Sequence, residues 1–258
     1  MNLLIANYHT HTPRCNHATG SEAEYVRAAM DAGIQILGFS DHTPYFFPGD
    51  YYSHFRMRPE QFPDYCEAVR RVQKQYAPQI RIHLGVECEY YPKHFTDVLS
   101  LLRDHQVEYM ILGQHFINNE YDGPYTGVHT DREADFRTYA HQAMDAMNTG
   151  LFTYFAHPDL AHFQVPDRVY LDYMRQICRE AKNCGIPVEI NLLGYREHKW
   201  YPNPLLYEAA ALEDCPVIIG CDAHAPEVFA DQETENRARS LIQTYGLKPL
   251  DTVELRKI

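Results

Sequence analysis

The chain has 258 residues, with 35 acidic and 23 basic side chains and a formal charge of −12 at pH 7. This length suits one barrel or one doubly wound sheet, so we expect a single domain of residues 1–258. The acidic charge disfavours nucleic acid as a partner, because it repels phosphate backbones. The seven cysteines contain no CxxC pair, and no basic leader or membrane-length apolar run is found, so we expect a soluble, cytoplasmic protein without a membrane partner.

Short apolar runs alternate with longer amphipathic segments, which predicts repeated βα units. In chain order, strands are predicted at Leu3–Tyr8, Ile36–Ser40, Ile80–Val86, Tyr109–Gly113, Thr153–Ala156, Pro187–Asn191 and Val217–Cys221. The helices between and after them are predicted at Ser21–Ala32, Pro59–Tyr76, Phe95–Asp104, Arg132–Asn148, Arg168–Cys184, Pro204–Glu213 and Gln232–Tyr245. The first helix carries its own start signal, because Ser21 followed by Glu24 has the form of a capping box.

One long irregular stretch, Thr43–Arg58, interrupts this alternation and is rich in Tyr, Phe, His and Pro. A loop of this kind above a barrel mouth is often a substrate lid. Its aromatic side chains would then stack on an imidazole or a nucleobase of the substrate. The alternative is a loop that packs on its own barrel.

Nearly every predicted strand ends in a side chain of a type that binds metals. These residues are His9, His11, Asp41, His42, Glu87, His115, His157, Asp222 and His224. Since the carboxyl ends of parallel strands meet on one face of a barrel, we expect these side chains to converge. Any one of them alone is more often a hydrogen-bonded or surface residue, but their repetition at successive strand ends favours a metal site. A mixture of imidazoles and carboxylates suits Zn, Fe or Mn better than Ca or Mg.

The same residues stand in a series of short motifs. In chain order these are HTHTPRCNH (His9, His11 and His17), FSDH (His42), GVECEY (Glu87), GQHFI (His115), AHPDL (His157) and GCDAH (Asp222 and His224). In these motifs the chain resembles the polymerase-and-histidinol-phosphatase (PHP) superfamily over almost its entire length. The resemblance implies an α/β fold, a distorted (β/α)7 TIM-like barrel.

By the same resemblance every ligand position of the trinuclear members is filled, which implies three divalent transition-metal ions, Mn, Fe or Zn. The first ion would be held by His9, His11, Glu87 and Asp222. A second would be held by His115 and His157, with Glu87 as a bridge, and the third by His17, His42 and His224. Glu87 and Asp222 are therefore also the predicted catalytic residues.

Two longer segments, EYVRAAMDAGIQILGFSDHTP and EINLLGYREHKWYPNP, resemble the histidinol-phosphate phosphatase branch of that superfamily. This implies a phosphomonoesterase that hydrolyses L-histidinol phosphate in histidine biosynthesis, with a small phosphorylated substrate and a water activated by metals as the nucleophile. The alternative is a related phosphoesterase acting on nucleotides or oligonucleotide ends. A third hypothesis, a non-catalytic metal-binding module, conflicts with the complete ligand set.

Three residues are predicted to bind the substrate. Arg196, just beyond the sixth predicted strand, would bind two phosphate oxygens in a bidentate fork, with a surface ion pair as its alternative role. Arg14, in the first ligand-bearing loop, is a second candidate. After AHPDL the branch is expected to carry KF or RKF, whereas this chain has AHF; a protonated His162 is the third candidate and would make affinity depend on pH.

Other roles stay open at the level of sequence. The leaving oxygen could take its proton from Asp41, from Asp159 or from a metal-bound water, and Asp41 is favoured instead as a residue that orients His42 or a neighbouring ligand. Glu120 and Asp122 are candidates for the substrate's amine on charge alone. A homo-oligomer is compatible with the sequence.

Overall fold

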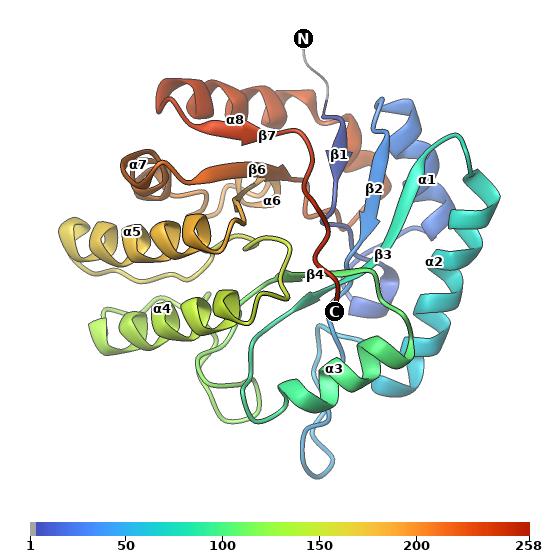
Figure 1. Cartoon of the computed structure of the whole chain (residues 1–258), viewed down its shortest axis with the longest axis horizontal. Helices are drawn as coiled ribbons and strands as arrows, with labels where there is room; N and C mark the ends of the chain where they lie inside the picture. The colour runs from blue at the N-terminus through green and yellow to red at the C-terminus, as the bar shows by residue number, and fades with distance from the viewer. Residues whose placement is uncertain (1–3) are drawn as a thin grey trace.

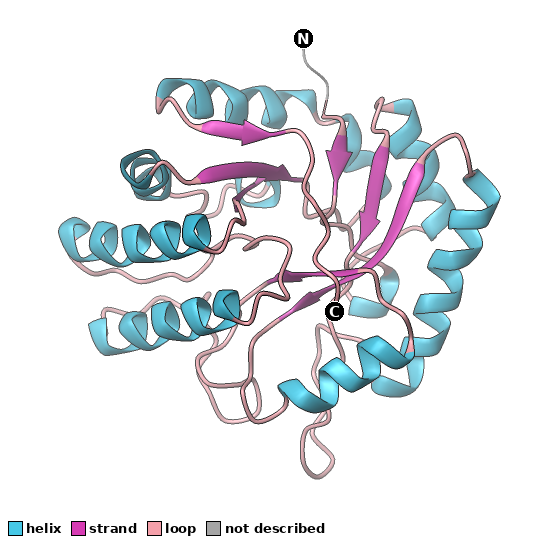
Figure 2. Ribbon diagram, viewed as in Figure 1, coloured by secondary structure: helices cyan, strands magenta, loops and turns pink. Residues whose placement is uncertain are grey.

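The computed structural model describes residues 4–258; Leu3, where the first predicted strand begins, lies outside this range. Helices form an outer ring around a curled sheet (Figure 1), and Figure 2 shows the strands inside that ring. The strands are β1 (Ala6–Asn7), β2 (Ile36–Phe39), β3 (Arg81–Cys88), β4 (Tyr109–Leu112), β5 (Val188–Asn191), β6 (Pro216–Gly220) and β7 (Lys248–Leu250). The helices are α1 (Glu22–Asp31), α2 (Phe62–Tyr76), α3 (Phe95–Asp104), α4 (Glu133–Asn148), α5 (Asp167–Asn183), α6 (Leu192–Arg196), α7 (Pro204–Glu213) and α8 (Gln232–Thr244).

The strands are joined in parallel into a closed, irregular ring. β1, β2, β3 and β4 pair in that order, and β5, β6 and β7 form a second set. Phe155 joins the two sets, because it bridges Leu112 at the end of β4 and Val188 at the start of β5. A further parallel bridge, between Thr10 and Ala223, joins the continuations of β1 and β6. The predicted distorted TIM-like barrel of α/β type is therefore confirmed.

Two strands differ from their predictions. Residues 153–156 run between β4 and β5 and exchange backbone hydrogen bonds with both, but they pair only through Phe155 and form no regular strand. β7, which the apolar pattern did not indicate, pairs with the first part of β6. Its three residues, KPL, are exposed and include a proline, so they lack the apolar run that reveals a buried strand.

The predicted helices lie within a residue or two of their expected ends, with a 3₁₀ turn before α2. At the start of α1 the Ser21 amide donates to the Glu24 carboxylate at 2.7 Å, as the capping box predicted. α6 was not predicted, because its five residues are too few to show a helical period. It begins where the Asn191 side chain accepts a hydrogen bond from the Gly194 amide at 3.3 Å. No helix within residues 4–258 has the length and apolar character needed to span a membrane.

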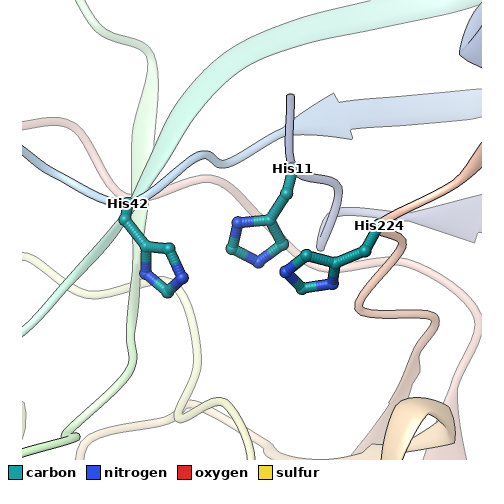
Figure 3. Close-up of side chains that lie close together, drawn as sticks. All are labelled: His11, His42 and His224. Carbon is teal, nitrogen blue, oxygen red and sulfur yellow. The ribbon is translucent and has the colours of Figure 1, made fainter. Parts of the chain in front are cut away.

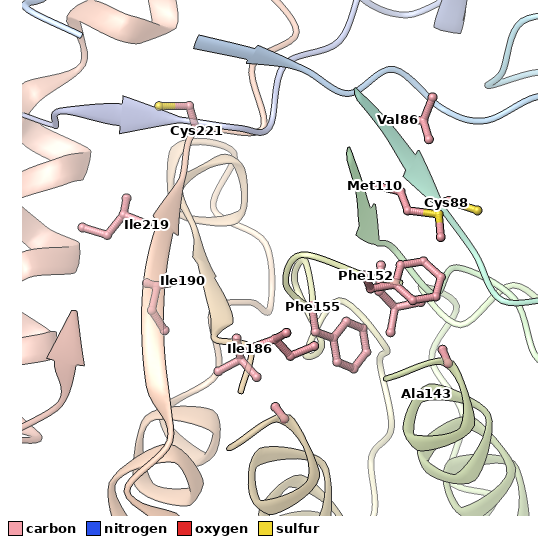
Figure 4. Close-up of a cluster of buried hydrophobic side chains, with 14 of the residues drawn as sticks. Val86, Cys88, Met110, Ala143, Phe152, Phe155, Ile186, Ile190, Ile219 and Cys221 are labelled. Atoms are coloured by element: carbon pink, nitrogen blue, oxygen red, sulfur yellow. The ribbon is translucent and has the colours of Figure 1, made fainter. Parts of the chain in front are cut away.

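Buried side chains form an outer and an inner layer, because residues alternate in direction along each strand. On β4, Met110 packs in the large layer between sheet and helices, while Tyr109 belongs to the interior cluster. Figure 4 shows part of the outer layer, in which Met110 comes from β4, Phe155 from the segment between β4 and β5, and Ile219 from β6. The outer layer holds the helices on the barrel, and the inner layer decides what space remains inside it.

The amino-terminal end of the barrel interior is filled. Tyr109 lies over Gly38 and Gly85, where a Cβ atom would collide with its ring. The C-terminal segment crosses the strands at this end (Figure 1), and Val253 and Leu255 pack against the interior cluster. The carboxyl end is thereby left for function, as in other barrels of this type.

Candidate metal centre

Glu87 is the penultimate residue of β3, lies at the centre of the candidate site and is fully buried. Its Oε2 atom lies 2.9 Å from His42 Nδ1 and 3.6 Å from the Nε2 atoms of both His9 and His11. These imidazoles follow β1 and β2, the two strands that precede β3 in the sheet. One carboxylate oxygen therefore faces three imidazole nitrogens.

The second oxygen of Glu87 faces a different pair of imidazoles. Oε1 lies 2.8 Å from His157 Nε2 and 3.4 Å from His115 Nε2. Gly113, directly after β4, makes room for this carboxylate, because a Cβ atom there would overlap Glu87 Oε1. Glu87 thus lies between two groups of imidazoles, which is the position of a ligand that bridges two ions.

Asp222, two residues beyond β6, completes the first group. Its Oδ1 atom lies 3.2 Å from His11 Nε2 and 3.5 Å from His9 Nε2, while Asn191 donates to Oδ2 at 3.0 Å. Asp222 and His157 both have φ in the left-handed region, at 46° and 30°. Such conformations cost energy in residues other than glycine and cluster at functional sites.

His17 and His224 lie close enough to share one cation. Their Nε2 atoms are 2.9 Å apart. Each Nδ1 faces a backbone carbonyl, that of Cys15 at 2.7 Å and that of Asp222 at 3.1 Å. Because a carbonyl only accepts, each Nδ1 carries the hydrogen, and the two Nε2 atoms of neutral rings present lone pairs to each other. A metal ion held by both nitrogens would remove this repulsion.

His11, His42 and His224 direct their rings toward a common space, as Figure 3 shows. One donor atom of each lies within 4.8 Å of the others. Burial lowers the pKa of His42 well below its ordinary value and lowers that of His224 to about 3. Both rings are therefore neutral, which is the form of imidazole that binds metals.

Two of the imidazoles are each held from behind by a buried glutamate. Glu189 Oε1 lies 2.9 Å from His9 Nδ1, and Glu89 Oε1 lies 2.9 Å from His115 Nδ1. Since these carboxylates accept, each Nδ1 carries the hydrogen and each Nε2 turns its lone pair toward the site. Sequence reasoning missed both glutamates, although an acidic residue inside the buried strand β5 was an available signal.

Arg56 belongs to the long aromatic loop and connects it to Glu89, the glutamate behind His115. Its guanidinium is 2% exposed, donates to both oxygens of Glu89 at 2.7 and 3.1 Å, and donates to Glu120 at 2.8 Å. The same group donates to the backbone carbonyl of Thr43 at 2.6 Å. The loop Thr43–Arg58 is therefore anchored on the barrel, which matches the packed-loop alternative.

The donor atoms of the cluster lack partners within the protein. Among the described residues, those buried without a hydrogen bond include His9 Nε2, both ring nitrogens of His11, His42 Nδ1, both oxygens of Glu87 and Asp222 Oδ1. Burial would raise the pKa of the Glu87 carboxyl, but the imidazoles that face it outweigh this effect and hold the pKa well below its usual range. Buried, ionised and unpartnered donors are costly unless a cation binds them, so these residues fit transition-metal ions.

A cavity of about 570 Å³ opens above the cluster. Its floor is formed by the histidines with Glu87 and Asp222. Its walls are lined by Phe55, Phe116, Tyr125, Leu160, Leu193, Glu197, Lys199 and Tyr201. A mostly apolar wall over a polar floor is typical of small-molecule sites.

Residues 7–192 match the PHP domain. The chain belongs to the PHP domain family. Within it, a Deinococcus radiodurans protein named "probable histidinol-phosphatase" is 33% identical over 247 residues, 90% of this chain and 93% of that protein. A Schizosaccharomyces pombe protein of the same name is 24% identical, over 95% of this chain and 88% of its own. The crystal structure of histidinol phosphate phosphatase from Lactococcus lactis, complexed with zinc, L-histidinol and phosphate, has a TM-score of 0.73 at 18% identity and covers 98% of this chain and 100% of its own.

The family assignment predicted from the motifs is thus confirmed. Eight of the nine predicted ligands form the floor of the cavity in this PHP centre, and the ninth, His9, is buried against Glu87 and Asp222. The predicted substrate-binding residues do not line the cavity. Arg14 instead forms ion pairs with Glu22 at 2.5 Å and Asp64 at 2.6 Å. The His162 ring stacks on Trp200, with centroids 4.2 Å apart. Loop contacts of this kind leave no periodic signal in a sequence.

Arg196, the remaining predicted substrate-binding residue, is the last residue of α6. Its Nε donates to Asp231 at 3.2 Å, so the ion pair named as its alternative role is present. Its Nη2 lies 3.5 Å from the carbonyl of Cys221, the residue before the ligand Asp222. Nη1 is buried and has no partner within residues 4–258. One arm of the guanidinium is therefore without a partner, although Arg196 does not line the cavity.

Proposed function

We propose that this PHP protein is a metal-dependent phosphomonoesterase that hydrolyses L-histidinol phosphate to histidinol and inorganic phosphate. The observation that carries the chemistry is the cluster around Glu87, whose unpartnered donors open into a small-molecule cavity. The substrate is proposed from the Deinococcus radiodurans relative, which bears the name of that activity at 33% identity over 90% of this chain. A cytoplasmic location belongs to the same proposal and is supported by seven cysteines that are all free thiols.

The proposed cofactor is a set of three divalent ions, Mn, Fe or Zn. One ion is assigned to His9, His11, Glu87 and Asp222, a second to His115, His157 and Glu87, and the third to His17, His42 and His224. The two faces of Glu87 support its role as a bridge, and the facing lone pairs of His17 and His224 support the third position. Bound there, the ions would neutralise phosphoryl oxygens and lower the pKa of a water to near neutrality.

The protein's own residues hold the reacting groups in place. Glu189 and Glu89 fix the tautomers of His9 and His115, so the ligands need little reorganisation when substrate binds. The unpartnered Nη1 of Arg196 is proposed to bind a phosphate oxygen, since charge-assisted hydrogen bonds from arginine suit phosphate. The apolar walls of the cavity limit the water that competes for these contacts.

Neither aspartate considered as proton donor lines the cavity. Asp41 accepts hydrogen bonds from the amides of Thr12 and His42 at 3.2 and 2.8 Å and lies 3.5 Å from His11 Nδ1. Asp159 is buried and accepts a hydrogen bond from the Asn203 amide, and burial raises its pKa to about 7. We therefore propose that Asp41 orients His11 and that the leaving oxygen takes its proton from water in the cavity.

Phosphate release from a substrate panel tests the proposal. The panel contains histidinol phosphate, AMP, a nucleoside bisphosphate and a short oligonucleotide, each offered to protein reconstituted with Mn, Zn or Fe. We expect kcat/KM for histidinol phosphate to exceed the others by at least about 100-fold, or roughly 2.7 kcal/mol in transition-state binding. A preference for nucleotides would keep the metal chemistry and overturn the substrate, whereas no turnover with metals bound would favour a non-catalytic module.

A further inference from the structure

The cavity contains one pair of opposite charges that the proposed chemistry does not use. Glu197 and Lys199 follow α6, and both line the cavity above the metal ligands. Lys199 Nζ lies 2.8 Å from Glu197 Oε2. Apart from the floor residues Glu87, Asp222 and the histidines, these two are the charged side chains among the described residues that line the cavity. A charged group of a substrate that lies against the cavity wall would therefore meet this pair.

Glu120 and Asp122, which the sequence suggested as partners of the substrate's amine, already accept hydrogen bonds from other residues. Glu120 accepts hydrogen bonds from Arg56 at 2.8 Å and from Tyr51 at 3.0 Å. Asp122 accepts one from Asn119 at 2.7 Å. Neither lines the cavity. Glu197 is left as the carboxylate within reach of a bound ligand that is not assigned to a metal.

The Glu197–Lys199 pair is also easy to open. The two side chains are 49% and 37% exposed, and ion pairs in contact with water contribute little to stability. Histidinol phosphate carries an ammonium group on the carbon next to the one that bears the phosphate ester. Such a substrate offers each member of the pair a new partner of opposite charge, so charges are exchanged and none is left unpaired.

We propose that the Glu197–Lys199 pair is the recognition site for an ammonium-bearing phosphate ester, in which Glu197 accepts the substrate's ammonium and Lys199 turns to its phosphate. This inference rests on the proposed function, because it takes a phosphate bound at the metal floor as the fixed point. It explains how a cavity with mostly apolar walls selects one amino phosphate among many phosphate esters. An ester that lacks the amine either leaves Lys199 paired with Glu197 and loses its contact with the phosphate, or takes Lys199 and leaves Glu197 unpaired, and it binds less tightly in both cases.

The test compares histidinol phosphate with its analogue that lacks the amine, using metal-loaded wild type, Glu197→Gln and Lys199→Met. The matched controls are Asp214→Asn and Lys182→Met, an ion pair of similar exposure (55% and 45%) that lies outside the cavity. Steady-state kinetics gives kcat and KM for both esters, and calorimetric titration with histidinol and with inorganic phosphate measures binding without turnover.

We expect Glu197→Gln to lower the preference for histidinol phosphate over the analogue by at least about 10-fold, mainly through KM, and to weaken histidinol binding similarly, as for loss of a hydrogen bond between charged groups. Lys199→Met should weaken both esters equally and weaken inorganic phosphate, while both controls behave as wild type. An unchanged preference and unchanged histidinol binding in Glu197→Gln would overturn the inference alone. If wild type releases no phosphate from histidinol phosphate but Glu197→Gln still weakens histidinol binding, the proposed function fails and the inference survives.

Discussion

The floor and the mouth of the cavity are built in different ways. On the floor, most of the proposed ligands are buried near strand ends, and His9 and His115 each have a buried glutamate behind them. At the mouth, Glu197 and Lys199 hold only each other and are partly exposed. The floor is thus rigid and prepared for charge before a ligand arrives, whereas the mouth can exchange its partners. We therefore expect substitutions on the floor to abolish activity and substitutions at the mouth to change only the preference among substrates.

The largest effect is expected from Glu87→Gln, which keeps the volume of the central side chain and removes its charge. Activity should fall by at least about 10³-fold, as when an electrostatic partner of the transition state is lost. Bound metal, measured by elemental analysis of the purified protein, should fall with it. Glu67→Gln on the exposed face of α2 is the control. A variant with full metal content and wild-type kcat would contradict the bridging role of Glu87.

The next effect concerns the layer behind the floor. Arg56→Met leaves Glu89 and Glu120 buried without their cation, so the free energy of unfolding in denaturant should fall by about 3–5 kcal/mol. Arg58→Met, in the same loop, is the matched control, because Arg58 is exposed and lies over the Tyr52 ring. Its loss should stay below about 1 kcal/mol. Equal losses in the two variants would mean that the buried network does not stabilise the floor.

A smaller effect is expected from Glu189→Gln, which retains a hydrogen-bond acceptor behind His9 and loses the negative charge. Metal affinity, measured by competition with a chelator, should weaken by about 10–100-fold. Glu197→Gln at the mouth should leave metal affinity at the wild-type value, which separates the two regions directly. Equal metal affinities in Glu189→Gln and wild type would show that this glutamate does not tune the site.

The floor could be predicted from sequence because strand geometry and burial dictate it. A residue such as Glu87 or His115 that follows a buried parallel strand can only emerge at the carboxyl face of the barrel. The barrel itself follows from the same apolar runs, apart from β7, whose exposed residues carry no apolar signal. These positions depend on local patterns that repeat from strand to strand.

The mouth could not be predicted in the same way, since its residues lie in loops, where no repeating pattern shows which side chains face the cavity. Arg14 has the charge expected for phosphate binding, but Glu22 and Asp64 take it up. Lys199 was not singled out, because a lysine in a loop has no periodic neighbours that reveal a cavity wall. The glutamates behind the floor were missed as well, because a sequence does not show that a predicted ligand such as His9 or His115 has a second partner on its other ring nitrogen.

The smallest effect is expected at the amino-terminal end of the barrel, away from both the floor and the mouth of the cavity. There Glu108 accepts a hydrogen bond from His83 Nδ1 at 2.6 Å and others from Gln73 and the Leu84 amide. This histidine–carboxylate pair resembles those of the floor, but it precedes β4 and lies away from the cavity. It should therefore affect stability and leave metal content and kcat unchanged.

Its pH dependence distinguishes it further. Burial would raise the pKa of the Glu108 carboxyl, but the hydrogen bonds from His83, Leu84 and Gln73 outweigh it and hold the pKa below its ordinary value. A carboxyl with a lowered folded-state pKa stabilises the protein above its unfolded pKa and loses that contribution as pH falls through the folded value. Glu108→Gln should thus cost about 0.5–1 kcal/mol at pH 7, a figure kept small because the pair is partly exposed. That cost should vanish on acidification below the folded pKa, and a cost that persists unchanged in acid would show that packing, rather than the ionised carboxylate, is what the substitution removes.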